Sequence, residues 1–242
     1  MRGWWREISG LVLPVACGGC GRPRAELCEE CRAEFHGGVP RRVRPVPEPV
    51  GLPAVYAAAA YENAVRAVLL AHKERGELGL AGALGKALAG AVRAGVGHAG
   101  VVGPLLLVPV PSARRAVAAR GHDPTRRIAL AAAGELRRGG TPARVVAVLR
   151  QHRAVADQAG LGAGRRQANL AGALEVPAGG ERLLAAGRVV LVDDLLTTGA
   201  SLAEAARAVA AACGHAGAVP GGGQAAVVAA SPSAFEINRN CQ

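Results

Sequence analysis

Residues 189–201 read Val-Val-Leu-Val-Asp-Asp-Leu-Leu-Thr-Thr-Gly-Ala-Ser, and this run predicts a strand, a short loop and the start of a helix. Its first four residues are apolar, as in a strand covered on both faces. Two carboxylates follow, then hydroxyl groups and Gly199, which lets the backbone approach a ligand closely. Backbone N–H groups converge at a helix N-terminus, where the helix dipole favours negative charge. The run therefore predicts a phosphate-binding loop.

The two adjacent carboxylates, Asp193 and Asp194, predict a second ligand group. They cannot bind phosphate, but they can accept hydrogen bonds from a vicinal diol. A phosphate on one side and a diol on the other describe a ribose 5-phosphate. The alternative is a strand–helix turn with an acidic edge and no ligand. Burying two acids at the end of a strand costs free energy unless they are used, which favours the ligand.

This run closely resembles the phosphoribosyl-diphosphate (PRPP) binding motif of type I phosphoribosyltransferases. The resemblance implies that Asp193 and Asp194 hold the 2- and 3-hydroxyls of the ribose. It also implies that the 5-phosphate is wrapped by the residues that follow, Leu195, Leu196, Thr197, Thr198, Gly199, Ala200 and Ser201.

The hydrophobic pattern of the chain predicts an α/β fold. Strands are expected at 54–60, 105–110, 145–149, 173–176, 188–192 and 224–230, and helices at 62–94 (two, broken near 76–79), 125–136 and 201–213. Residues 111–121 are expected to form a basic loop, and Asp123 and Pro124 to cap and begin the next helix. Strands that alternate with helices indicate a mainly parallel sheet with helices on both faces. With the resemblance above, this pattern predicts the type I phosphoribosyltransferase fold.

The cysteines near the N-terminus form two C-x2-C pairs, Cys17 with Cys20 and Cys28 with Cys31. Two such turns can bring four thiolates together around a tetrahedral Zn²⁺. Four sulfur ligands leave no open position, so the zinc is expected to be structural. Redox pairs and disulfides are the alternatives, and a cytoplasmic chain disfavours disulfides. His36, close by, is expected to be solvated.

Three parts are expected along the 242 residues. A zinc-binding head covers residues 1–37, and an extended linker rich in proline and arginine covers 38–53. The phosphoribosyltransferase-like domain covers 54–242. No stretch is long and apolar enough to span a membrane, and a cytoplasmic protein is expected.

Two further loops complete the site by resemblance to type I phosphoribosyltransferases. The loop after the strand at 105–110 suits the diphosphate of PRPP, which is expected to bind with Mg²⁺; its candidate ligands are Ser112, Arg114, Arg115 and Arg120. A solvated basic turn is the alternative. Residues 151–169 stand where the family has a mobile catalytic loop. That loop carries the candidate catalytic residues Arg153, Arg165 and Arg166, together with Gln158 and Asn169.

The whole arrangement resembles the ComF family, phosphoribosyltransferase-like proteins tied to competence for DNA uptake. The resemblance rests on Leu13-Pro14, the four cysteines, Tyr61 with Lys73, Val108-Pro109-Val110-Pro111, Arg120-Gly121, Gln158, Arg166, Asn169 and the PRPP motif. Where the family usually continues Arg-Gly-Phe-Asn-Gln, this chain has His122-Asp123-Pro124 after Arg120-Gly121. That departure affects what the resemblance implies about substrate contacts more than what it implies about the fold.

Composition leaves three functions open. The net charge of +11 suits nucleic acid or phosphorylated ligands, although an arginine-rich coding bias explains it equally well. Aromatic residues make up 2% of the chain, which argues against a stacking platform for single-stranded DNA. The candidates are a phosphoribosyltransferase with an unknown acceptor, a non-catalytic PRPP- or nucleotide-binding protein, and an accessory that contacts single-stranded DNA or a competence helicase.

Overall fold

A computed structural model describes residues 16–97, 103–153, 169–214 and 223–239. A six-stranded sheet lies at the centre, with the strand order β1-β2-β8-β7-β3-β4. The strands are β1 (Arg41–Val43), β2 (Ala54–Ala60), β8 (Gln224–Ala230), β7 (Arg188–Leu196), β3 (Leu105–Pro109) and β4 (Ala143–Val145). Only β1 is antiparallel to its neighbour in this sheet. The predicted α/β architecture with a mostly parallel sheet is therefore confirmed.

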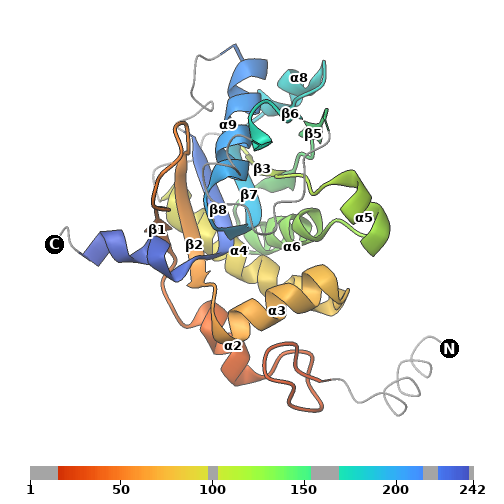
Figure 1. Cartoon of the computed structure of the whole chain (residues 1–242), viewed down its shortest axis with the longest axis vertical. Coiled ribbons are helices and arrows are strands. Elements are labelled where there is room, and N and C mark those ends of the chain that lie inside the picture. The colour runs from red at the N-terminus through yellow and green to blue at the C-terminus, as the bar shows by residue number, and fades with distance from the viewer. Residues whose placement is uncertain (1–15, 98–102, 154–168, 215–222, 240–242) are drawn as a thin grey trace.

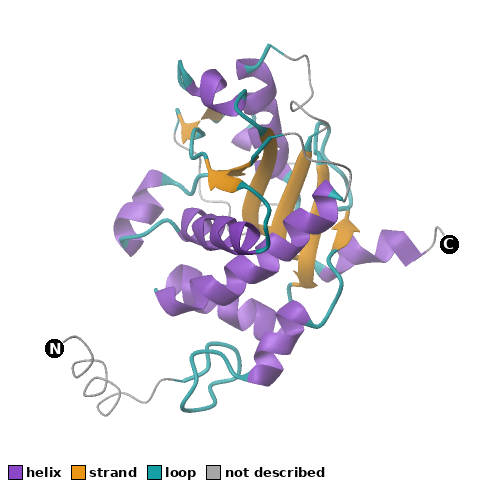
Figure 2. Ribbon diagram, turned by 180° about the vertical axis from the view of Figure 1, so that it is seen from behind, coloured by secondary structure: helices purple, strands orange, loops and turns teal. Residues whose placement is uncertain are grey.

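Helices cover both faces of the sheet (Figures 1 and 2). They are α2 (Glu29–His36), α3 (Asn63–Glu74), α4 (Ala81–Val96), α5 (Arg114–Arg120), α6 (Pro124–Arg138), α8 (Gly180–Leu184) and α9 (Ala200–Ala212), with 3-10 turns η1 (Leu78–Leu80) and η2 (Pro232–Arg239). A small antiparallel pair, β5 (Arg150–Gln151) and β6 (Leu174–Glu175), lies apart from the main sheet. Helices α4 and α6 pack on one face, and α9 packs on the other.

The two faces have separate cores because successive strand residues point to opposite sides. In β3, Leu105 and Leu107 face the core under α4 and α6, whereas Leu106 and Val108 face the core under α9. Both cores are rich in alanine, whose small side chain allows helices to approach closely. Helices α4 and α6 approach closely at Gly85, which is buried.

We expect Gly85→Ala to lower the free energy of unfolding by roughly 1–3 kcal/mol, because overpacking strains a filled core. An added Cβ at Gly85 would lie 2.8 Å from the backbone nitrogen of Ala132. Gly82 is the matched control, since it stands exposed on the same helix with nothing within 4 Å. Gly82→Ala should stabilise the chain by up to about 1 kcal/mol through helix propensity. Chemical denaturation measures both, and equal effects would contradict the close packing of α4 and α6.

Several predicted boundaries are wrong. Residues 114–120 form helix α5, not a loop. Strand β7 continues to Leu196, because the backbone stays paired with β8 beyond the two aspartates. Strand β4 ends at Val145, although the residues after it are largely buried. The helix cap is confirmed: Asp123 accepts a hydrogen bond of 3.0 Å from the backbone N–H of Arg126.

The N-terminal head and the linker are both built into the body of the protein. Cys17, Cys28 and Phe35 belong to the same apolar cluster as Val68 of α3 and Leu84 of α4. The linker supplies the edge strand β1, which pairs with β2. His36 is half-buried rather than solvated, and burial lowers its pKa. Within the described ranges, no helix is long and apolar enough to cross a membrane.

Candidate functional site

The strand order creates a crevice between β3 and β7. Strand β3 leads through α6 outward to β4, whereas β7 leads through α9 in the other direction to β8. Ligands of open α/β sheets bind at such a switch point, beyond the carboxyl ends of the strands. Strand β3 ends at Pro109, opposite Val192, while β7 runs on beside β8. The residues of β7 after Val192 therefore border the crevice.

A cavity of about 870 Å³ occupies this crevice. It is lined by Lys73, Val110, Pro111, Ser112, Ala113, Arg115, Ala116, Ala119, Arg120, Thr125, Gln151, Leu170, Leu174, Asp193, Asp194, Leu195, Thr197 and Ser201. Helix α5, which buries none of its residues, forms one side of it. The volume is in the usual range for small-molecule and cofactor sites.

Asp193 and Asp194, the acid pair, lie beside a lysine in the cavity wall. Lys73, at the end of α3, donates a 2.7 Å hydrogen bond to Oδ2 of Asp194. Burial opposes ionisation of Lys73, but the charges of Asp194 and Asp193 outweigh it and raise the pKa of Lys73. Burial likewise opposes ionisation of Asp194, but the charge and hydrogen bond of Lys73 lower the pKa of Asp194. The two form an ion pair, with 7% of the Asp194 side chain exposed.

Asp193 differs from its neighbour in its ionisation. Burial, followed by the charge of Asp194, raises the pKa of Asp193 well above its usual value. Its Oδ1 accepts a 2.8 Å hydrogen bond from the backbone N–H of Asp194. The pair therefore offers one carboxylate that is firmly ionised and one that holds a proton more readily.

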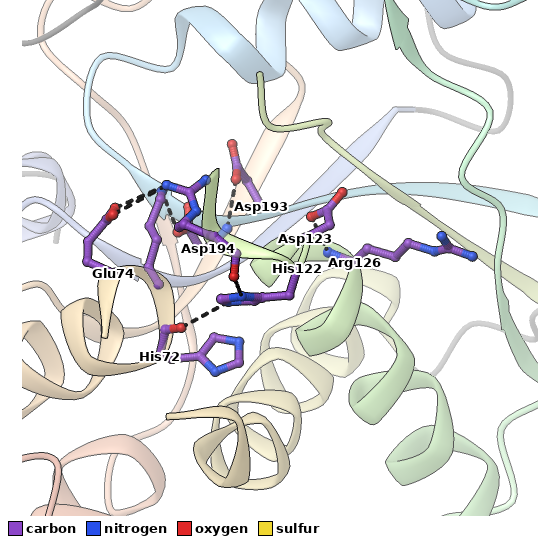
Figure 3. A network of polar contacts seen from close by, with 9 residues as sticks. His72, Glu74, His122, Asp123, Arg126, Asp193 and Asp194 are labelled. Carbon is purple, nitrogen blue, oxygen red and sulfur yellow. Dashed lines mark hydrogen bonds and ion pairs between the residues drawn. The ribbon is translucent and has the colours of Figure 1, made fainter. Parts of the chain in front are cut away.

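A second cation, Arg120, enters the cavity from the end of α5. Its guanidinium lies 3.3 Å and 3.4 Å from the two carboxylate oxygens of Glu74. The Arg120 side chain is 17% exposed, and its buried Nε has no hydrogen-bond partner among the described residues. Figure 3 shows Glu74, the acid pair and His122 in the same part of the site. An anionic ligand in the cavity can accept from further N–H groups of the Arg120 guanidinium, which carries five donors in all.

The predicted phosphate loop lies between β7 and α9. Its residues surround a second small cavity, lined by Asp193, Leu195, Leu196, Thr197, Thr198, Gly199, Ala200, Ser201 and Leu202. Gly199 has a φ of +78°, in the left-handed region that favours glycine, and it immediately precedes the first turn of α9. A Cβ there would lie 3.1 Å from Leu52 and 3.3 Å from Pro45. The linker thus lies against the outside of the loop.

The structure brings most of the predicted ligands together and leaves two apart. Ser112, Arg115 and Arg120 line the cavity with the acid pair. Arg114 stands exposed at the start of α5. The guanidinium of Arg153 donates to the carbonyl oxygens of Asn169 and Ala171, at 2.9 Å and 2.7 Å. The other loop candidates, Gln158, Arg165 and Arg166, lie outside the described residues.

Lys73 was not predicted as a ligand of the site, although it contacts the acid pair directly. It is 121 residues from Asp194 along the chain, so no local pattern relates the two. Two signals were present: Lys73 is among the residues that carry the ComF resemblance, and Lys73 and Lys86 are the only lysines among 29 basic residues. A lysine retained in an arginine-rich chain marks a position where a compact point charge is useful.

The four cysteines of the head converge as predicted. The Sγ atoms of Cys17, Cys20, Cys28 and Cys31 all lie within 4.8 Å of one another. In tetrahedral zinc sites, Zn–S bonds of ~2.3 Å place the sulfurs roughly 3.8 Å apart, and Cys20 and Cys28 are 3.6 Å apart. Burial opposes ionisation of Cys17, but backbone N–H groups of Cys20, Cys28 and Gly19 lower its pKa to about 6. The cluster can hold a metal ion such as zinc.

No protein-family model and no curated protein matches this chain. What the site does is therefore argued from its geometry and from the motifs in the sequence.

Proposed function

We propose that this chain is a ComF-like protein of the type I phosphoribosyltransferase fold that binds PRPP with Mg²⁺. One observation carries the proposal. The run 193–201 borders the cavities at the switch point of the sheet, with the acid pair at one end and the helix N-terminus at the other. This arrangement offers acceptors to a ribose diol and N–H donors to a 5-phosphate.

The remaining groups of the cavity suit the diphosphate of PRPP. Arg115, Arg120 and Lys73 line the same space, and Ser112 adds a hydroxyl donor. Guanidinium forks match phosphate oxygens, so the three cations favour the diphosphate over a neutral group. Mg²⁺ binds through substrate phosphates and one or two carboxylates, and in the described part of the chain Asp193 and Asp194 are the carboxylates that line the cavity.

Phosphoribosyl transfer would use these charges directly. As diphosphate leaves C1 of the ribose, positive charge develops on the sugar and negative charge on the leaving group. The acid pair stabilises the first, and Arg115, Arg120 and Lys73 stabilise the second. The acceptor is a nucleophile of unknown class.

The second candidate is a protein that binds PRPP or a nucleotide without turnover, as an accessory to single-stranded DNA or a helicase. One observation favours it. The titratable residues that line the cavity in the described part of the chain are the acid pair, Lys73 and the two arginines. Neither a histidine nor a glutamate stands among them to deprotonate an acceptor.

In the head, we propose a structural Zn²⁺ held by Cys17, Cys20, Cys28 and Cys31. Four thiolates complete its coordination, so the ion would stabilise the fold and take no part in transfer. The support is the close approach of the four sulfurs.

PRPP with Mg²⁺ is expected to raise the thermal midpoint of the purified chain. Ligand at 100 times its Kd adds about 2.7 kcal/mol to the free energy of unfolding. Ribose 5-phosphate should bind more weakly, because it lacks the diphosphate, and 2-deoxyribose 5-phosphate more weakly still, because it lacks one hydroxyl of the diol. Thermal shift followed by titration calorimetry measures the order. Equal affinity for the two sugar phosphates would contradict binding of the diol by the acid pair.

Release of diphosphate separates the two candidates. A panel of nucleobases and amines, added with PRPP and Mg²⁺, should yield diphosphate with one acceptor if the chain is a transferase. Tight binding of PRPP with no diphosphate from any acceptor would favour the non-catalytic candidate. Titration of the full chain with single-stranded DNA at several salt concentrations tests the accessory role independently.

A further inference from the structure

His122 joins two separate segments of the cavity wall. It stands in the turn between α5 and α6, with its Nδ1 3.1 Å from the carbonyl oxygen of Arg120 and its Nε2 3.2 Å from that of His72 (Figure 3). Both carbonyl oxygens are acceptors, so each contact needs a ring nitrogen that donates. The neutral ring makes one of these bonds at a time, and the protonated ring makes both. The contact to His72 is the one that ties the turn to the end of α3.

The segment bonded by His122 is the end of α3, which also carries the cavity residue Lys73. His72 is fully buried, its Nδ1 lies 3.3 Å from the carbonyl oxygen of Glu77, and its ring packs edge-on against His122 with centroids 5.9 Å apart. The next two residues are Lys73, which bonds Asp194, and Glu74, which bonds Arg120. The last residues of α3 are thus connected to the next segment twice, through the bond of His72 to His122 and through the ion pair of Glu74 with Arg120.

These contacts connect the segments that carry two cations of the cavity. Lys73 comes from α3 and Arg120 from α5, and helix α5 has no buried residue to hold it against the body. The ion pair between Arg120 and Glu74 is loose, with half of the Glu74 side chain exposed, and an exposed pair contributes little. The bond from His122 to the backbone of His72 is the better-shielded tie.

We propose that His122 is a positioning residue that sets Lys73 and Arg120 at the spacing required by the diphosphate of the ligand. This inference rests on the proposed function and adds to it a group that favours a sugar 1-diphosphate over the sugar monophosphate. Among the described residues, the two ring nitrogens bond the carbonyl oxygens of Arg120 and His72 and not the acid pair or the phosphate loop, so the ring acts through the two cations.

A matched pair of variants isolates the tie to His72. In His122→Gln the side-chain amide nitrogen reaches the place of Nε2, whereas in His122→Asn it reaches only the place of Nδ1. We expect His122→Asn to bind PRPP with Mg²⁺ about fivefold more weakly than His122→Gln, the equivalent of one hydrogen bond. Ribose 5-phosphate should bind both variants equally, and His122→Gln should bind PRPP within about twofold of the parent. Titration calorimetry measures the four affinities.

The outcomes separate this inference from the proposed function. A parent chain that binds no PRPP overturns both. A parent that binds PRPP, with the two variants equal to each other, overturns the positioning role and leaves the proposed function standing. Equal losses of PRPP and ribose 5-phosphate in His122→Asn, with a lowered thermal midpoint in the absence of ligand, would show a merely structural residue and also overturn it. Both substitutions are polar and smaller than the ring, so neither overfills the turn.

Discussion

Removal of the zinc ion proposed for the four-cysteine site should lower the free energy of unfolding of the whole chain by at least about 3 kcal/mol. Structural zinc contributes its binding free energy to folding. The effect should extend beyond the head, because Cys17 and Phe35 share one apolar cluster with Val68 and Leu84. Metal analysis should give about one Zn²⁺ per chain, and denaturation with and without chelator measures the loss.

Two cysteine-to-serine variants test whether the loss comes from the cluster. Cys31→Ser removes a buried ligand and should lose both the zinc and the stability. Cys213→Ser alters a half-buried cysteine that caps the C-terminal end of α9, on the other face of the sheet, and should keep both. A metal-free chain that is as stable as the parent, or equal effects of the two variants, would rule out a structural metal in the head.

The double variant Asp193→Asn, Asp194→Asn should bind PRPP with Mg²⁺ at least tenfold more weakly than the parent. Each carboxylate that accepts from the diol contributes roughly 1.5–3 kcal/mol as a charged hydrogen-bond acceptor. Lys73 loses its partner, but 35% of its side chain is exposed, so water can solvate the ammonium. Titration calorimetry measures the affinity. The matched control is Asp123→Asn, which should retain binding because asparagine also caps a helix.

Substitution of Asp193 should affect the free energy of unfolding differently from ligand binding. The pKa of Asp193 is raised in the folded chain by burial and by the charge of Asp194. Its ionisation therefore costs stability as the pH rises through that raised value. Asp193→Asn should remove this cost and leave the chain at least as stable as the parent at neutral pH. A large loss of stability in the single variant would mean that the charged form of Asp193 supports the fold instead.

The sequence predicted the parts of the fold that depend on burial. Strands β2, β3 and β8 and helices α3, α4, α6 and α9 follow from apolar runs and periodic faces, because each packs into one of two cores. Helix α5 was missed for the same reason: it buries nothing and has no apolar stripe to reveal it. Residues 145–149 were predicted as a strand from their apolar side chains. Val146, Val148 and Leu149 are buried, but burial alone does not require a ladder, and β4 ends at Val145. The polar Asp193 and Asp194 predicted a loop, while pairing with β8 extends the strand through them.

The sequence predicted the site residues that lie within one short run, but not the contacts between residues far apart in the chain. The run 193–201 carries its own spacing, so its acid pair and loop could be recognised together. The contacts from Lys73 to Asp194 and from His122 to His72 join residues far apart in the chain. Each depends on how α3, α5 and β7 meet, which no local pattern encodes.

The antiparallel strand β1 has a consequence for where the chain can be cut. It shields the outer edge of β2, and the segment after it lies against Gly199 through Pro45 and Leu52. A shortened chain that begins at Ala54 would expose the backbone of β2 as an open strand edge, to which a second molecule can add. The same cut would uncover the phosphate loop. The sheet domain taken alone is therefore expected to self-associate. The shortest fragment expected to stay monomeric begins before β1.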